Sequence, residues 1–259
     1  MTRPAPPAAQ SLLDEAVQLA RDAGEFTLGY FRDTDLNVER KADGTEVTDA
    51  DRGAERLVRE ELARRHPDDA ICGEEEGEQA GTTGRLWYID PIDGTKAFTQ
   101  GVPLFCNLIA AYDEHGPAVG VINMPALAET VYAGRGLGAF CNGAPAHVSA
   151  RREPQGAFLT TSGYDYWPVA LLAAAQTRGY QMRTWGDGYG YALVATGRAE
   201  AMVDPIASPW DLAPMPVIVG EAGGTFTSLD GSDSIEAGSG VATNGHLHSD
   251  VLDALGPVR

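Results

Sequence analysis

The stretch EEEGEQAGTTGRLWYIDPIDGTKAF, residues 74–98, decides how this chain is interpreted. Consecutive glutamates precede an apolar, strand-like run, LWYI, which ends in two aspartates, Asp90 and Asp93. Pro91 fixes its own φ and disfavours helix at the residue before it, so we expect the chain to turn at the end of the strand. The two carboxylates then converge on one point, and the carbonyl of Ile92 points into the same space.

Two explanations of these acids remain open. The glutamates can be a solvated loop, and the aspartates can be turn residues that hydrogen-bond their own backbone. Alternatively, the acids surround a cation. Oxygen ligands without convergent His or Cys favour hard divalent cations, Mg²⁺ above all. Gly94 and Thr95 then open a short helix, whose unpaired N–H groups suit an anion such as phosphate.

Composition limits the function classes. The chain has 259 residues, enough for one large domain or two modest ones, and its net charge of −18 repels nucleic acids and anionic membrane surfaces. Three cysteines, Cys72, Cys106 and Cys141, form no C-x-x-C pair, so neither a zinc site nor a disulfide framework is indicated. With no secretion-type or membrane-spanning apolar segment, we expect a cytoplasmic protein that binds neither nucleic acid nor membrane.

The hydrophobic pattern alternates between helix and strand. Apolar spacing predicts a helix over residues 11–31, and Thr48 with Asp51 forms a T-x-x-D capping pattern that starts a second helix. Short apolar runs then predict strands, with a hairpin at the DEHG segment. Beyond residue 150, strands alternate with four predicted helices, near 165–178, 188–197, 209–222 and 247–255. The expected organisation is an N-terminal α+β half, residues 1–150, and a C-terminal α/β half, residues 151–259.

A second acidic element strengthens the metal hypothesis. Asp211 lies in the first turn of an apolar helix, where its simpler role is an N-terminal cap. The segments GEE (73–75), WYIDPIDGTKAF (87–98) and PWDLAPMPVIVGEAGG (209–224), in this order, resemble the inositol-monophosphatase-like family of Mg²⁺-dependent, lithium-sensitive phosphatases. The resemblance extends from about residue 12 to residue 255. It implies the layered αβαβα sandwich of the inositol monophosphatase/fructose-1,6-bisphosphatase superfamily, a small phosphorylated substrate and a homodimer.

The resemblance also implies roles for individual residues. It implies two or three Mg²⁺ ions held by Glu74, Asp90, the Ile92 carbonyl, Asp93 and Asp211. Glu74 and Asp90 count as catalytic for this reason, and Asp211 also as a substrate contact. Hydrolysis would proceed by metal-activated attack of a water.

Four other positions match the family motifs around this metal-binding set. Asp51 and the Thr95 hydroxyl match the pair that orients the attacking water. The N–H groups of Gly94 and Thr95 match those that hold phosphate, and Lys41 matches a lysine on a flexible loop over the site. Glu75 and Glu76 match no functional position and are expected to be solvated or to lie behind the ligands.

The segment RTWGDGYGYALVATGRAEAMVDPIASPWD, residues 183–211, bears on the substrate. It departs from the inositol-specific members and is similar to histidinol-phosphate phosphatases of the inositol-monophosphatase type. Aromatic faces and additional carboxylates suit a cationic imidazole and amine better than a neutral polyol. The candidate contacts of the histidinol end are Arg183, Asp187, Tyr189, Tyr191 and Asp204. The tyrosines can instead pack the helix against the sheet, and the arginine can be a surface residue.

The preferred substrate is therefore L-histidinol phosphate. Inositol monophosphate, fructose 1,6-bisphosphate and a nucleotide 3′-phosphate remain alternatives within the same reaction class. A non-catalytic protein that binds a cation or phosphate is the alternative from another class. Asp51 and Thr95 argue against it, because they serve the chemistry and are not needed for cation binding alone.

Overall fold

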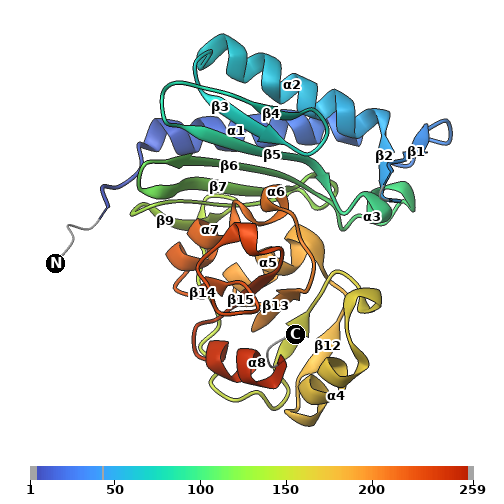
Figure 1. Ribbon diagram of the computed structural model, residues 1–259, viewed down its shortest axis with the longest axis vertical. Helices are drawn as coiled ribbons and strands as arrows, with labels where there is room; N and C mark the ends of the chain where they lie inside the picture. Colours follow the sequence, from blue (N-terminus) through green and yellow to red (C-terminus); the bar gives the residue numbers. More distant parts are fainter. Residues whose placement is uncertain (1–4, 43, 256–259) are drawn as a thin grey trace.

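The computed structural model describes residues 5–42 and 44–255, which form five layers (Figure 1). Two helices cover an eight-stranded sheet, a central layer of helices follows, and a five-stranded sheet carries two further helices on its outer face (Figure 1). This order of layers is the αβαβα sandwich expected from the sequence. No helix in the described ranges combines the length and the hydropathy needed to cross a lipid bilayer.

The outermost helices of the first half are α1 (Gln10–Leu28) and α2 (Asp49–Arg65). Before α2, the short strands β1 (Val38–Arg40) and β2 (Glu46–Thr48) form a hairpin of their own. The capping pattern predicted at the start of α2 is confirmed. The Thr48 hydroxyl accepts the N–H groups of Ala50 and Asp51, and the carboxylate of Asp51 accepts the N–H of Thr48 at 2.7 Å.

The eight-stranded sheet has the order β10-β9-β8-β7-β6-β5-β3-β4. Its only parallel pair among the described residues is β3 with β5, and the hairpin predicted at DEHG joins β6 to β7. The strands are β3 (Ala70–Gly73), β4 (Gly77–Gln79), β5 (Leu86–Asp93), β6 (Cys106–Asp113), β7 (Gly116–Met124), β8 (Glu129–Gly134), β9 (Gly138–Cys141) and β10 (Ala144–Pro145). Two short helices connect them, α3 (Thr95–Thr99) and the 3₁₀ turn η1 (Pro125–Leu127).

The central layer contains α5 (Asp187–Ala195), α6 (Pro209–Leu212) and α7 (Met215–Glu221). The single helix predicted over 209–222 is wrong in this respect, since it is divided between α6 and α7. Proline lacks the N–H that would continue the helical ladder, and Pro214 lies at the division. Because α5 and α7 contact a sheet on either side, they are apolar around most of their circumference, and both sheets contribute to one central hydrophobic cluster.

The second sheet has the order β12-β11-β13-β15-β14. Its strands are β11 (Phe158–Thr160), β12 (Gln181–Arg183), β13 (Ala201–Asp204), β14 (Thr225–Thr227) and β15 (Gly240–Thr243). Helices α4 (Val169–Thr177) and α8 (His248–Leu255) cover its outer face, and the 3₁₀ turns η2 (Tyr164–Tyr166) and η3 (Ile235–Ala237) lie in the connections. The division that we propose near residue 150 falls between β10 and β11.

Candidate functional site

A bulge in β5 brings the two aspartates of the D-P-I-D segment to the same side. Asp90 pairs with Leu108 and Asp93 pairs with Cys106, so β5 uses three steps where β6 uses two. In a regular strand two residues three apart face opposite sides, and the additional residue restores them to one side. The sequence predicted a turn after Asp90, and that detail is wrong because β5 continues through the bulge to Asp93.

Asn107 holds the bulge from the neighbouring strand. Its side chain is fully buried, and its amide donates to the carbonyl of Pro91 at 2.7 Å. Asn123 on β7 donates to the Asn107 side-chain oxygen at 3.1 Å and to the carbonyl of Ala20 at 3.0 Å. This buried network fixes the backbone between the two aspartates, and no feature of the sequence pattern indicated it.

Asp211 approaches the same point from the second half of the chain. It lies at the start of α6, where it accepts the N–H of Ser208 at 2.8 Å and so fulfils the capping role as well. Carboxylate oxygens of Asp90, Asp93 and Asp211 all lie within 4.8 Å of one another. The structure therefore brings together three of the acids that the sequence selected.

Burial makes this cluster costly without a cation. The pKa of Asp90 is raised well above its ordinary value by burial and by the carboxylates of Glu74, Asp93 and Asp211. Burial likewise raises the pKa of Asp211 to about 7, against the opposing effect of the Ser208 N–H. One oxygen of Asp90 is buried without a hydrogen-bond partner among the described residues. An all-oxygen donor set with an unsatisfied carboxylate fits a hard divalent cation such as Mg²⁺.

The consecutive glutamates differ in their surroundings. The carboxylate of Glu74 accepts a hydrogen bond from Lys41 Nζ at 2.8 Å and contributes to the raised pKa of Asp90, so it faces the site. Glu75 is not a solvated acid, because its side chain is only 6% exposed and accepts a hydrogen bond from Lys41 at 2.6 Å. Glu76 is a surface acid near Arg56 and Arg59. Partial burial lowers the pKa of Lys41, but its bonds to Glu74 and Glu75 outweigh burial and raise it.

Asp51 and Thr95 also lie together. Asp51 is fully buried and uses one oxygen for the helix cap, while the other oxygen lies 3.5 Å from the Thr95 hydroxyl. That hydroxyl donates to the carbonyl of Ile92 at 3.0 Å. Burial raises the pKa of Asp51 to about 6, although its bonds to Thr48 oppose the shift. A carboxyl with this pKa is ionised at neutral pH and can accept a proton from a water.

A cavity of about 320 Å³ opens beside these residues. Glu74, Gly94, Thr95 and Asp187 line it, as the sequence led us to expect for a site. Gly94 has φ +85°, and a side chain there would approach Asp187 and the Leu104 carbonyl to 3.1 Å. The polar lining residues that sequence reasoning missed are Thr45, Glu46, Lys96, Ser162 and Thr184. Lys96 lies inside the segment WYIDPIDGTKAF (87–98) and Thr184 inside the segment 183–211, so these two were within stretches that carried the resemblance, and the other three carried no signal.

The remaining substrate candidates lie outside the cavity wall. Tyr191 is buried in the central cluster and Tyr189 packs against it, which is the packing role considered as their alternative. Arg183 is exposed on β12, with its guanidinium over the rings of Phe158 and Trp185. These positions provide no contact with the cavity, because burial or stacking holds each side chain elsewhere.

Asp204 does not line the cavity itself but bonds to Ser162, which does. Its carboxylate accepts a hydrogen bond from the Ser162 hydroxyl at 2.6 Å, and that hydroxyl accepts the N–H of Asp187 at 2.9 Å. Burial raises the pKa of Asp204 to about 7. Asp187 has φ +53°, a strained value for a residue other than glycine, so its placement depends on this chain of hydrogen bonds.

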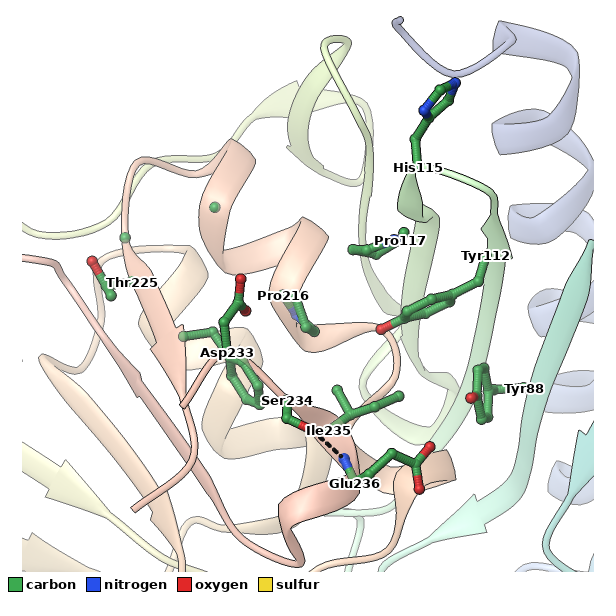
Figure 2. Close-up of a pocket in the computed structure, with 14 residues that line it drawn as sticks. Tyr88, Tyr112, His115, Pro117, Pro216, Thr225, Asp233, Ser234, Ile235 and Glu236 are labelled. Carbon is green, nitrogen blue, oxygen red and sulfur yellow. Dashed lines mark hydrogen bonds between the residues drawn. The ribbon is translucent and has the colours of Figure 1, made fainter. Parts of the chain in front are cut away.

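A larger cavity, about 730 Å³, lies elsewhere between the two halves (Figure 2). Figure 2 shows Tyr88 and Tyr112 along one side, with Asp233 and, in η3, Glu236 opposite. The Tyr112 hydroxyl donates to the carbonyl of Ala213 at 3.0 Å. None of the sequence-selected site residues lines this cavity.

Comparison with known proteins agrees with this geometry. The sequence is similar to proteins named histidinol-phosphatase from Chlorobaculum parvum, 44% identical over 94% of this chain and 96% of the relative, and from Mycobacterium tuberculosis, 43% identical over 93% and 96%. The fold matches the solved IMPase of Thermotoga maritima with a TM-score of 0.86 and 31% identity, covering 95% of this chain and 97% of that one. The sequence profile of the inositol monophosphatase family matches residues 8–257, and the chain belongs to that family.

Proposed function

We propose that this phosphatase is Mg²⁺-dependent and hydrolyses L-histidinol phosphate to L-histidinol. The observation that carries the proposal is the convergence of Asp90, Asp93 and Asp211 beside a cavity that Asp187 lines. The two relatives named histidinol-phosphatase, which align with nearly the whole chain, support the choice of substrate.

The acids have a defined task in this reaction. We assign Glu74, Asp90, Asp93, Asp211 and the Ile92 carbonyl as the groups that hold the metal. Bound Mg²⁺ would neutralise the phosphate oxygens, lower the pKa of water and stabilise the leaving alkoxide.

Two residues, Asp51 and Thr95, act on the attacking water. Asp51 accepts a proton from that water, for which its pKa of about 6 is suitable near neutral pH. The Thr95 hydroxyl, fixed by its bond to the Ile92 carbonyl, orients the water toward phosphorus. The N–H groups of Gly94 and Thr95, at the start of α3, position the phosphate.

The cavity wall favours a cationic alcohol. Asp187 and Glu46 line the cavity, and Asp204 lies directly behind Ser162. Glu46, Glu74 and Asp187 outnumber the cationic Lys96 in the described lining. This excess of carboxylates attracts an ammonium or imidazolium group and gives no comparable advantage to a neutral polyol. We propose that Asp187 contacts the histidinol end directly and that Asp204 acts on it through Ser162.

A substrate panel tests the proposal. The protein with Mg²⁺ is assayed for phosphate release from histidinol phosphate, inositol 1-phosphate and fructose 1,6-bisphosphate. We expect the highest kcat/KM for histidinol phosphate, and Asp187→Asn should raise its KM about tenfold while leaving that of inositol phosphate nearly unchanged. A higher kcat/KM for inositol phosphate would overturn the substrate assignment and leave the phosphatase chemistry intact.

Inositol-1-phosphate is the second candidate substrate, because the family profile and the Thermotoga IMPase both favour it. The same panel separates the two candidates. A non-catalytic cation or phosphate binder would bind Mg²⁺ and release no phosphate from any of the three compounds.

We further propose a cytoplasmic homodimer with two or three Mg²⁺ ions per site. The three cysteines are free thiols, which is consistent with a reducing compartment. Sedimentation analysis tests the dimer, and the metal content of the dialysed protein tests the number of ions.

A further inference from the structure

Glu55, a buried carboxylate outside the site, bonds to the backbone that follows Glu74. Glu55 lies one helical turn after Asp51 on α2, and its side chain is fully buried. Its carboxylate accepts the N–H of Glu75 at 2.7 Å and the N–H of Glu76 at 3.0 Å. Arg59, a further turn along α2, donates to the same carboxylate at 2.8 Å. All of these bonds involve a charged group and are therefore stronger than neutral ones.

Glu55 and Arg59 also contact the backbone on both sides of the turn that carries Glu74. Gly73 and Gly77 face each other where β3 and β4 meet, and the Arg59 guanidinium donates to the Gly77 carbonyl. A Cβ on Gly73 would lie 2.1 Å from a Glu55 oxygen, so the carboxylate packs directly against the backbone before Glu74. The N–H of Glu74 itself donates to the Ile89 carbonyl at 3.2 Å. The backbone on each side of Glu74 is thus fixed.

We propose that Glu55, together with Arg59, is a positioning residue that directs Glu74 toward Asp90 and so sets the affinity for the metal. This inference rests on the proposed function, since it assumes that Glu74 is a ligand. A buried ion pair is a poor source of stability, because well-packed apolar groups usually serve as well. Holding a metal-binding side chain such as Glu74 in place is a different requirement from stabilising the fold, since it needs directional bonds to the backbone.

Asp69 offers a matched control within the same sheet. It precedes β3 and is 3% exposed, and its carboxylate accepts hydrogen bonds from Thr83 at 2.5 Å and from Trp87 at 2.9 Å. It therefore resembles Glu55 in burial and bonding, but it lies at the opposite end of β3 from Glu74. Replacing Asp69 should affect stability and leave metal binding unchanged.

The test compares Mg²⁺ binding by calorimetry in the wild type, Glu55→Gln and Asp69→Asn, with urea unfolding of each. Glutamine keeps the shape of Glu55 but has one acceptor oxygen for the two N–H groups. We expect Glu55→Gln to weaken Mg²⁺ binding about tenfold and to leave kcat at saturating Mg²⁺ within about twofold. Asp69→Asn should lower the urea midpoint and change Mg²⁺ affinity by less than about twofold.

Two results would overturn the inference: unchanged Mg²⁺ affinity in Glu55→Gln, or an equal loss in Asp69→Asn. If Glu55→Gln does not fold, Arg59→Lys replaces it, since lysine keeps the charge and cannot make both the Glu55 and Gly77 bonds. It should weaken Mg²⁺ binding about threefold, and unchanged binding would again overturn the inference. A wild type that binds no Mg²⁺ would instead remove the proposed function.

Discussion

Two of the cavities that acids line can be compared directly, and the larger of these two is not the candidate active site. The cavity in Figure 2, about 730 Å³, has its carboxylates, Asp233 and Glu236, exposed to solvent. The smaller cavity, about 320 Å³, adjoins carboxylates that are buried against one another. Water solvates the first pair at little cost, whereas the buried group needs protons or a cation.

The difference shows that the burial of charged groups, rather than cavity size or the number of acids, distinguishes the candidate site from the larger cavity. In the larger cavity the raised pKa values belong to tyrosines. Burial, with Glu236 adding to it, raises the pKa of Tyr88 to about 12. In the smaller cavity the raised values belong to carboxyl groups, whose charge the proposed reaction requires. The following predictions test this contrast.

The largest expected effect is on activity. Asp93→Asn removes one of the converging charges and should lower phosphate release from histidinol phosphate about 10³-fold or more, about 4 kcal/mol. Its unfolding free energy in EDTA should stay equal or rise, because a repelling charge is gone. Phosphate assay and urea unfolding check the two parts. Retention of a tenth of the wild-type rate would refute the role of this acid.

The pH dependence of stability comes next. The pKa of Asp204 is about 7 in the folded protein against an ordinary value of 3.8, so the folded state binds more protons between these values. In EDTA, the contribution of Asp204 to stability is therefore greatest below about pH 4 and falls as pH rises toward 7, by about 1.4 kcal/mol per unit of pKa difference at most. Urea unfolding from pH 4 to 8 measures the slope. Asp204→Asn should reduce it, and an identical slope in this variant would contradict the assignment.

A smaller effect is expected at the bulge. Asn107→Ala removes the hydrogen bond to the Pro91 carbonyl, leaves that buried carbonyl without the donor and removes one of the two acceptors of the Asn123 amide, which should cost about 2 kcal/mol of stability. The activity should also fall, since the spacing of the two aspartates depends on this bond. Asn142→Ala is the control, because Asn142 is an exposed asparagine whose side chain bonds backbone groups of Ala128 and Thr130 rather than those of the bulge. Equal losses in both variants would count against a special role for Asn107.

The smallest effects belong to the open cavity. Asp233→Asn and Glu236→Gln should change activity by less than about twofold and stability by less than about 0.5 kcal/mol, as expected for exposed side chains. The same assays used for Asp93→Asn check this. A large loss of activity from either change would erase the contrast between the two cavities.

Local signals in the sequence predicted much of the fold. The helix cap at Thr48, the hairpin at DEHG and the short helix after Gly94 are confirmed, because each depends on residues a few positions apart. The order of the layers came from the family resemblance. Pro214 was visible in the sequence, but the apolar pattern around it concealed the division between α6 and α7.

The site was less predictable where it depends on distant residues. The converging acids were identified from motifs, but the surroundings of Glu75 depend on its bond to the distant Lys41, and the bonds of Glu55 to the turn after β3 depend on where α2 lies over the sheet. The hydrophobic pattern placed Tyr191 on a helix, but this helix is buried between two sheets, and the pattern does not show which way the tyrosine points. Such outcomes are set by tertiary packing, which a single sequence does not encode in a readable pattern.

The bulge in β5 also constrains protein engineering. A designer who transplants D-P-I-D into a regular sheet would place the second aspartate on the reverse surface, where no cation could bridge the pair. The graft would need a neighbouring strand one residue shorter over the same interval, with an asparagine at the position of Asn107 to satisfy the displaced carbonyl. The transferable unit is therefore a pair of strands, and copying the four-letter motif alone would fail.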